Sequence, residues 1–107
     1  MAAASPPDET LAGWAKALAH PARITILRTL GARGECVCGE VVEVVGLAQS
    51  TVSQHLKVLR EAGLVAGRAD GARSCYCLSP DALAAVTSGF AGLLGHLHAC
   101  ACGDDCC

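Results

Sequence analysis

The chain has 107 residues, a length typical of one domain, which leaves no room for a second domain of ordinary size. Hydrophobic residues make up 52% of the chain and charged residues 17%, so it has enough apolar surface to bury a core and is not expected to be disordered. The formal net charge of −2 argues against a wholly basic nucleic-acid binder, but it does not exclude a local basic face.

The first third of the chain predicts a tail and two helices. Residues 1–9 are expected to form a flexible tail. Thr10 is expected to cap a first helix with an apolar face. The dipeptide His20-Pro21 ends that helix and begins a second one, because proline fits the first turn of a helix and histidine can cap it. Gly31 together with Gly34 is expected to end the second helix.

The middle of the chain predicts a helix-turn-helix. A short helix is expected at residues 39–45, followed by a tight turn. Ser50 or Thr51 is expected to cap a longer helix that runs to about Ala62, where Gly63 stops it. Three apolar residues of this longer helix are spaced for one buried face: Val52, Leu56 and Leu59.

After this helix the apolar pattern changes to alternation, which is typical of strands. Residues 64–68 and 73–78 are expected to form two short strands, joined by an Asp-Gly turn within residues 69–72. Ser79 is expected to cap a last helix that has Pro80 in its first turn. It carries six apolar residues on one side: Leu83, Val86, Phe90, Leu93, Leu94 and Leu97.

This order of elements predicts a mainly α, α+β fold: a winged helix-turn-helix with about five helices and a two-stranded hairpin as the wing. Residues 10–98 would form this domain, and residues 99–107 a cysteine-rich tail without regular structure.

The second helix of the helix-turn-helix has an outer face of polar side chains, which are of the kind that contact base edges or phosphates in a major groove. Arg68 and Arg73 flank the hairpin tip and are placed to reach the DNA backbone or the minor groove. The candidate DNA-contacting residues are Gln49, Ser50, Thr51, Ser53, Gln54, His55, Lys57, Arg68 and Arg73.

Charge agrees with this assignment, since residues 49–77 hold four basic and two acidic residues while the whole chain is acidic. The excess is small, so operator affinity should need a dimer and should fall with salt. The alternative interpretation is a solvated helix face followed by a small hairpin.

Eight cysteines are the unusual feature of the composition, and such a count also occurs in secreted disulfide scaffolds. Residues 1–10 have neither the cationic start nor the apolar core of a signal peptide. Lys, Arg, Glu and Gly are taken to interrupt every apolar run before it can span a bilayer. We therefore expect a cytoplasmic protein without membrane contacts, in which thiols stay reduced and clustered cysteines bind metal or undergo redox chemistry.

Cys36 and Cys38 lie next to the start of the short helix, whose N-terminus favours thiolate over thiol. At a fraying helix end both sulfurs can point at one soft ion, such as As(III), Cd(II), Pb(II), Hg(II) or Zn(II). Two sulfurs do not close a site, so a further ligand must come from elsewhere. The alternatives are two half-buried structural cysteines or a redox pair.

The other cysteines form two groups. Cys75 and Cys77 alternate along the second strand, opposite Tyr76 and Leu78, which we assign to the core. They are either a second pair of ligands or small hydrophobic residues. The tail cysteines are candidate donors of the missing sulfur, an independent site or a dispensable end: Cys100, Cys102, Cys106 and Cys107. His96 and His98 are two positions apart on a helix, so they should diverge and make a poor ligand pair.

Four stretches of the chain resemble the ArsR/SmtB family of metalloregulators. They are HPARITIL at residues 20–27, ECVCGE at 35–40, QSTVSQHLKVLREAGLV at 49–65 and GRADGARSCYCL at 67–78. The resemblance covers about residues 10–98. It implies a homodimer through the first and last helices that binds an imperfect inverted repeat of double-stranded DNA. Ligand binding would lower operator affinity and release the transcription of resistance or efflux genes.

The Cys-Val-Cys element resembles the sulfur pair of arsenite and antimonite sensors, and also that of cadmium and lead sensors. Arsenite sensors often have a third cysteine where this chain has Val41, and cadmium sensors use an N-terminal arm that here has no cysteine. The third sulfur is therefore expected from the tail of the same chain or of its partner. Zinc sensors of the family use Asp and His on the last helix; Asp81 is present without the matching His, so that site is expected to be absent.

Three hypotheses follow. In the first, the chain is an arsenite- or antimonite-responsive repressor in which Cys36, Cys38 and one tail cysteine bind As(III) or Sb(III). In the second, the same repressor responds to Cd(II), Pb(II), Zn(II) or Hg(II). In the third, the chain is a cytosolic thiol-redox or metal-buffering protein with an incidental winged helix. An enzyme with a small-molecule substrate is not expected, because no paired carboxylates, nucleophile–base pair or phosphate loop is present.

Overall fold

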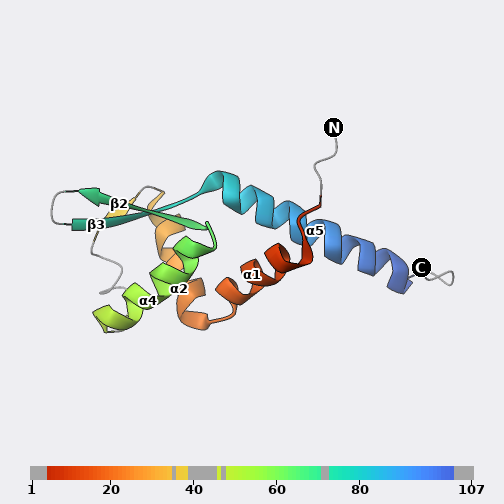
Figure 1. Cartoon of the computed structure of the whole chain (residues 1–107), viewed down its shortest axis with the longest axis horizontal. Helices are drawn as coiled ribbons and strands as arrows, with labels where there is room; N and C mark the ends of the chain where they lie inside the picture. Colours follow the sequence, from red (N-terminus) through yellow and green to blue (C-terminus); the bar gives the residue numbers. More distant parts are fainter. Residues whose placement is uncertain (1–4, 35, 39–45, 47, 71–72, 103–107) are drawn as a thin grey trace.

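The computed structural model describes residues 5–34, 36–38, 46, 48–70 and 73–102. This part of the chain contains four helices and a three-stranded antiparallel sheet, which lies at one end of the molecule (Figure 1). The elements are α1 (Asp8–Leu18), α2 (Pro21–Arg33), β1 (Val37–Cys38), α4 (Gln49–Glu61), β2 (Val65–Asp70), β3 (Arg73–Leu78) and α5 (Pro80–Cys102). The predicted winged helix-turn-helix fold is confirmed, while the short helix predicted at residues 39–45 lies outside the described residues.

Two predicted helix starts are wrong. The first helix begins at Asp8 with Pro7 as its N-cap, so Thr10 lies inside the helix and does not cap it. The recognition helix α4 begins at Gln49, because the Val52 amide already donates to the Ala48 carbonyl oxygen at 3.0 Å. Neither N-cap residue supplies a side-chain hydrogen bond, so preference for a polar cap did not decide these boundaries.

Two other predicted caps are confirmed. The Nδ1 atom of His20 accepts a hydrogen bond from the Ala22 amide at 3.1 Å, directly before the proline that opens α2. The hydroxyl oxygen of Ser79 accepts one from the Ala82 amide at 3.3 Å, at the start of α5. In both cases a side chain satisfies an amide that the first helical turn leaves unpaired.

The sheet has the order β1–β3–β2, so it contains one strand more than the predicted hairpin. In the hairpin, Val65 lies opposite Leu78 and Asp70 opposite Arg73, which leaves only residues 71–72 between the strands. β1 has two residues, too few to give an alternating sequence pattern, and only its pairing with β3 reveals it.

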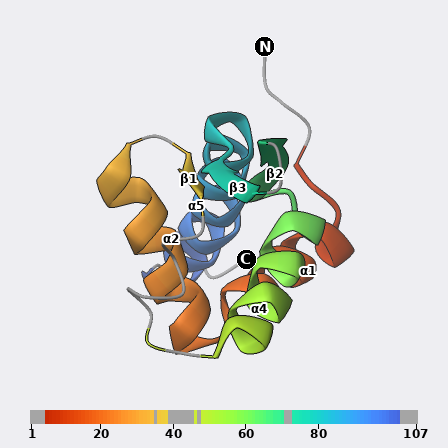
Figure 2. The same ribbon diagram turned by 90° about the vertical axis from the view of Figure 1, so that its left-hand side faces the viewer.

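The core lies between the sheet and the helices, where α2 and α4 pack against each other and against the strands (Figure 2). The three inward residues predicted for α4 are confirmed, and each is at most 4% exposed. The buried hydrophobic cluster consists of Ala17, Ile26, Leu30, Val37, Val52, Leu56, Leu59, Leu64, Val65 and Val86.

α5 leaves the sheet and packs on α1 through its N-terminal half, where the rings of Trp14 and Phe90 lie 6.4 Å apart. Its C-terminal half extends beyond α1 (Figure 1). Three of the leucines that the sequence places on one side of this helix are therefore exposed in the single chain. Their exposures are 41% for Leu93, 58% for Leu94 and 51% for Leu97.

Two further expectations about the end of the chain are wrong. α5 continues to Cys102, so Cys100 and Cys102 are helical and do not belong to an irregular tail. By length and composition alone, Pro80–Ala101 is also long and apolar enough to cross a membrane. A core or interface helix of a soluble protein meets the same test, so this property by itself is weak evidence for a membrane span.

Candidate nucleic-acid interface

The two faces of α4 differ as a recognition helix requires. Its inner face is buried against α2 and β2. Four of its predicted DNA-contacting residues are exposed on the outer side: Ser50, Ser53, Gln54 and Lys57. Thr51 and His55 are half-buried between the two faces, and the side chain of Gln49 lies outside the described part of the structure. The exposed side chains include hydrogen-bond donors and acceptors suited to base edges and phosphates.

His55 packs against a neighbour that the sequence did not indicate. Its ring lies 4.4 Å from that of His20, centroid to centroid, at the turn between α1 and α2. Burial lowers the pKa of His55, and the nearby charges of His20 and Arg23 lower it further. The neutral form of His55 is therefore favoured, and its contact with the α2 turn gives it a packing role.

Arg23 is a second residue that the sequence analysis missed. Its Nε atom is buried and has no hydrogen-bond partner in the described structure. Its placement beside His55 depends on how α2 and α4 pack, which the sequence alone does not show. The one sequence feature that pointed to Arg23 was its position in residues 20–27, a stretch that resembles the family.

The hairpin places its two arginine positions near the tip. Arg73 pairs with Asp70 at the last register position before the turn, and Arg68 lies opposite Cys75. This backbone geometry agrees with the predicted flanking positions. The side chains of both arginines lie outside the described part of the structure.

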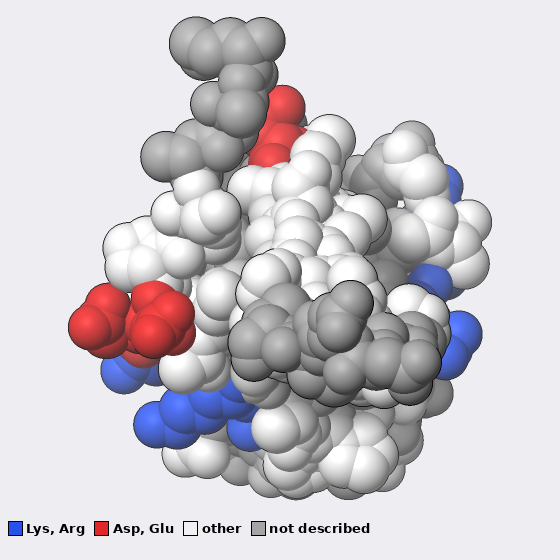
Figure 3. Space-filling model, turned by 90° about the vertical axis from the view of Figure 1, so that its right-hand side faces the viewer, with Lys and Arg blue, Asp and Glu red and all other residues white. Residues whose placement is uncertain are grey.

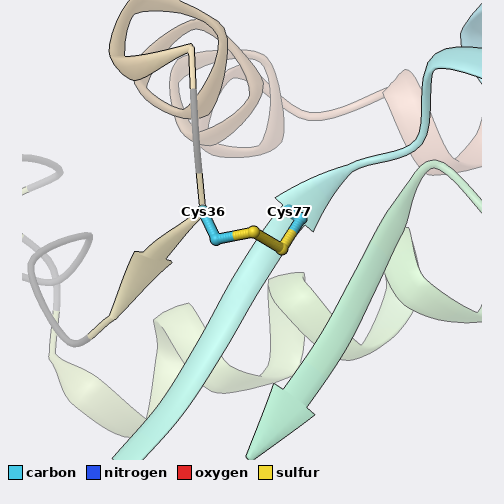
Figure 4. Close-up of a disulfide and its surroundings, with 2 residues drawn as sticks. All are labelled: Cys36 and Cys77. Carbon is cyan, nitrogen blue, oxygen red and sulfur yellow. A yellow bond between two sulfur atoms is a disulfide. The ribbon is translucent and has the colours of Figure 1, made fainter. Parts of the chain in front are cut away.

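Cys36 forms a disulfide with Cys77 of the wing strand β3, and their Cα atoms lie 4.3 Å apart (Figure 4). Cys75 is also disulfide-bonded. The expectation of reduced thiols, with Cys36 and Cys38 as a ligand pair, differs from this arrangement, because β1 pairs with β3 and sets Cys38 opposite Cys75. The side chain of Cys38 is not described.

Both faces of β3 are covered, although the alternating pattern had assigned only one face to the core. Cys75 is 3% exposed, so the face that the pattern left open between ligands and small hydrophobic residues is buried at this position. Tyr76 and Leu78, on the other face, are partly buried against the hydrophobic cluster, as predicted. Helix α2 packs on the Leu78 side of this strand, where a Cβ atom at Gly31 would lie 3.7 Å from Cδ1 of Leu78.

The end of α5 carries the other cysteines. The Sγ atom of Cys100 lies 3.8 Å from Nε2 of His96, one helical turn away, and Cys100 is also disulfide-bonded. Cys106, Cys107 and the side chain of Cys102 lie outside the described structure. Among the described residues, no group of three or more His, Cys, Asp or Glu side chains is placed to hold a metal ion.

Charge is unevenly distributed along the molecule. After Asp81, helix α5 contains no Asp, Glu, Lys or Arg. On the face of the molecule that carries the C-terminal end, acidic and basic side chains lie towards the edges and the surface between them is largely uncharged (Figure 3). The exposed part of α5 is therefore apolar, in contrast to the polar outer face of α4.

Comparisons with known proteins agree with this geometry. A helix-turn-helix domain family matches residues 18–68. The chain is 40% identical over 84 residues to the uncharacterized HTH-type transcriptional regulator YceK of Bacillus subtilis, covering 78% of this chain and 84% of YceK. It is 42% identical over 86 residues to the HTH-type transcriptional repressor SmtB of Mycobacterium tuberculosis, covering 78% of this chain and 63% of SmtB.

A solved structure described as a "possible transcriptional regulator for arsenical resistance" is similar to this one with a TM-score of 0.66 and 32% sequence identity, covering 73% of this chain and 80% of that chain. The fold, the polar outer face of α4 and the sequence identity to these regulators all indicate the same family. The chain belongs to the ArsR/SmtB family of helix-turn-helix transcriptional regulators.

Proposed function

We propose that the chain is a dimeric, cytoplasmic transcriptional repressor that binds operator DNA and is released by a thiophilic metalloid, arsenite or antimonite. α4 would enter the major groove with its exposed polar side chains, and the β2–β3 hairpin would contact the adjacent backbone or minor groove. Two copies would read the two halves of an imperfect inverted repeat, which offsets the small positive charge of each recognition surface.

We propose that the apolar C-terminal end of α5 packs against a second copy of this chain. Leu93, Leu94 and Leu97 are exposed in the single chain, on a helix that lacks charged residues over its last 21 positions. Exposed leucines on an uncharged helix favour burial against an equally apolar surface. A twofold interface satisfies this need because it brings the same patch of both subunits together.

The ligand proposed for Cys36 and Cys38 follows from the chemistry of their donor atoms. Thiolates are soft ligands that select soft ions, and As(III) takes three of them. The similarity to a structure described as a regulator for arsenical resistance favours a metalloid over a divalent cation. Because Cys36 is disulfide-bonded in this structure, its sulfur can bind an ion only after reduction.

The observation that carries the proposal is the position of Cys36. It lies directly before the helix-turn-helix segment and is bonded to the wing strand, and α4 lies between the two cysteines in the chain. A ligand that changes the spacing between Cys36 and β3 therefore acts on both DNA-contacting elements. To release DNA, it must bind the low-affinity arrangement more tightly than the DNA-bound one.

A second candidate keeps the repressor and changes the ion to Cd(II), Pb(II), Zn(II) or Hg(II). The similarity to the transcriptional repressor SmtB supports a repressor and leaves the ion open. Four- and three-thiolate sites suit these cations as well as they suit As(III).

The test is operator release by a panel of ions. The full-length protein, kept reduced with a phosphine, is bound to a duplex that it has enriched from a random library, and each ion is titrated while fluorescence anisotropy reports bound DNA. We expect arsenite and antimonite to release the duplex at the lowest concentrations. A scrambled duplex should bind far more weakly, since sequence-specific binding exceeds non-specific binding by about 10³-fold or more.

The matched variants are Cys36→Ser with Cys38→Ser. They should bind the duplex as the wild type does and should not be released by arsenite. Equal affinity for all sequences would contradict the repressor and support the thiol-redox or metal-buffering alternative. Normal release of the double variant would remove Cys36 and Cys38 from the inducer site, and release only by divalent cations would select the second candidate.

A further inference from the structure

Four cysteines occupy facing positions on β3 and on the segment formed by β1 and the residue before it, and we call them the cysteine ladder: Cys36, Cys38, Cys75 and Cys77. The disulfide joins Cys36 to Cys77, and the strand register sets Cys38 opposite Cys75. Val37 and Tyr76 form the intervening pair. The ladder is thus two cross-strand cysteine pairs separated by one pair of other residues.

Strand geometry brings such positions close together. Directly opposite residues of an antiparallel pair have Cβ atoms about 4.5–5.5 Å apart, and residues two apart on a strand face the same side. Cys75 and Cys77 therefore share a side of β3, and the disulfide establishes that Cys36 approaches that side. Metal-bound thiolates need a comparable separation, because each sulfur lies about 2.3 Å from a shared Zn(II) ion.

The cysteines of α5 are remote from the ladder in the same chain. Cys100 is 20 residues beyond Pro80, which corresponds to about 30 Å along a helix that leads away from the sheet (Figure 1). In the same chain, Cys100 therefore lies far from Cys36, and the cysteine next to Cys36 is Cys77.

We infer that the wing strand completes the inducer site: the described residues of the disulfide-bonded structure hold no group of three ligands, but in the reduced protein Cys77 and Cys75 join Cys36 and Cys38 in binding one thiophilic ion. This inference rests on the proposed function and names the donors of that same site. Its ligands are ions that take three or four thiolates, As(III) with three and Cd(II) or Zn(II) with four.

The chemistry has two balanced steps. A phosphine reduces each disulfide to two thiols and becomes its oxide, with water supplying the oxygen and the two protons. The ion then displaces one proton from each thiol that binds it. While Cys36, Cys75 and Cys77 are disulfide-bonded they have no thiolate to offer, so disulfide formation at these residues and ion binding to them exclude each other.

The site would link the ion to the wing directly. β3 pairs with β2 along the whole hairpin, and Cys75 lies opposite Arg68, one of the residues predicted to contact DNA. An ion held between β1 and β3 therefore fixes the hairpin relative to the segment that leads into the helix-turn-helix.

Cd(II) titration of the reduced full-length protein tests this inference without DNA, because cadmium–thiolate bonds absorb in the ultraviolet. Arsenite is measured in parallel by counting the thiols that it protects from a disulfide reagent. We expect one ion per chain with high affinity. Cys77→Ser should weaken binding by about tenfold or more, while the matched control Cys100→Ser should leave it unchanged.

Cys75 is buried, so its variant is Cys75→Ala, and circular dichroism of each variant checks that the fold is kept. Wild-type affinity in both Cys77→Ser and Cys75→Ala, with loss in Cys100→Ser, would overturn the inference and return the missing sulfur to the tail, leaving the proposed function intact. Ion binding that depends on Cys77 but does not release the operator would support the ladder and contradict the proposed function.

Discussion

The ladder of β1 and β3 and the end of α5 contain the same sequence element, Cys-x-Cys, but they hold their sulfurs differently. In a strand, residues two apart face the same side, so Cys75 and Cys77 both face one side of the sheet. In a helix, residues two apart diverge, and residues four apart meet. At the end of α5 the neighbour of Cys100 is accordingly His96. A cysteine spacing therefore predicts a ligand set only when its secondary structure is known.

The two regions also act on different surfaces. The ladder is tied to α4 and the hairpin, which are the elements proposed to contact DNA. The end of α5 carries exposed leucines, which are proposed to contact a second subunit. Perturbing the ladder should therefore change domain stability and release by the inducer, whereas perturbing α5 should change assembly.

The largest effect is expected from opening the ladder. The Cys36–Cys77 disulfide spans 41 positions, and loop-closure entropy predicts that its loss lowers the free energy of unfolding by about 3–4 kcal/mol. Urea unfolding of Cys36→Ser with Cys77→Ser measures this change. The phosphine-reduced wild type should match the phosphine-reduced double variant, since reduction also opens the disulfides of Cys75 and Cys100. An equal loss in Cys100→Ser would remove the contrast between the two regions.

The next effect concerns assembly through α5. Leu93→Asp with Leu97→Asp places charges on an apolar surface and should convert the dimer to a monomer, which sedimentation velocity measures. Operator affinity should then fall by about a hundredfold, since two linked half-site contacts become one. The fold should be kept, because both leucines are exposed in the single chain. A dimer that persists in this variant would place the interface elsewhere.

A smaller effect is expected where α5 crosses α1. A Cβ atom at Gly89 would lie 3.0 Å from the Trp14 ring and 3.1 Å from Leu11, whereas Gly92 has open space. Gly89→Ala should therefore lower the free energy of unfolding by about 1–3 kcal/mol through overpacking. The control Gly92→Ala should raise it by about 0.5–1 kcal/mol, because alanine favours helix. Equal behaviour of the two variants would contradict the close helix crossing.

The smallest effect is a pH dependence at α4. Burial and the charges of His20 and Arg23 lower the pKa of His55 from 6.5, so below that pH the unfolded chain takes up a proton that the folded chain resists. The stabilisation is present above pH 6.5 and is lost as the pH falls through the pKa of the folded state. NMR titration of His55 should give a pKa below 6.5, and His55→Gln should flatten the pH dependence of unfolding. An ordinary pKa for His55 would contradict its packing against the α2 turn.

The sequence by itself determined the fold class, the inner face of α4, the hairpin and the caps at His20 and Ser79. These features depend on local periodicity and on residues close in the chain, so a single pass along the sequence contains the information. Helix starts were less certain, because at Pro7 and Ala48 the backbone alone supplies the first hydrogen bonds of the helix.

Only the tertiary structure decided which cysteines face one another. Cys36 and Cys77 are 41 positions apart in the sequence. They meet because β1, directly after Cys36, pairs with β3, and β1 has only two residues, too few to give a periodic pattern. The same holds for His55 beside His20 and for the leucines of α5, whose exposure depends on where α1 ends along the helix. Pairing between distant segments is set by packing of the whole chain, and local pattern does not encode it.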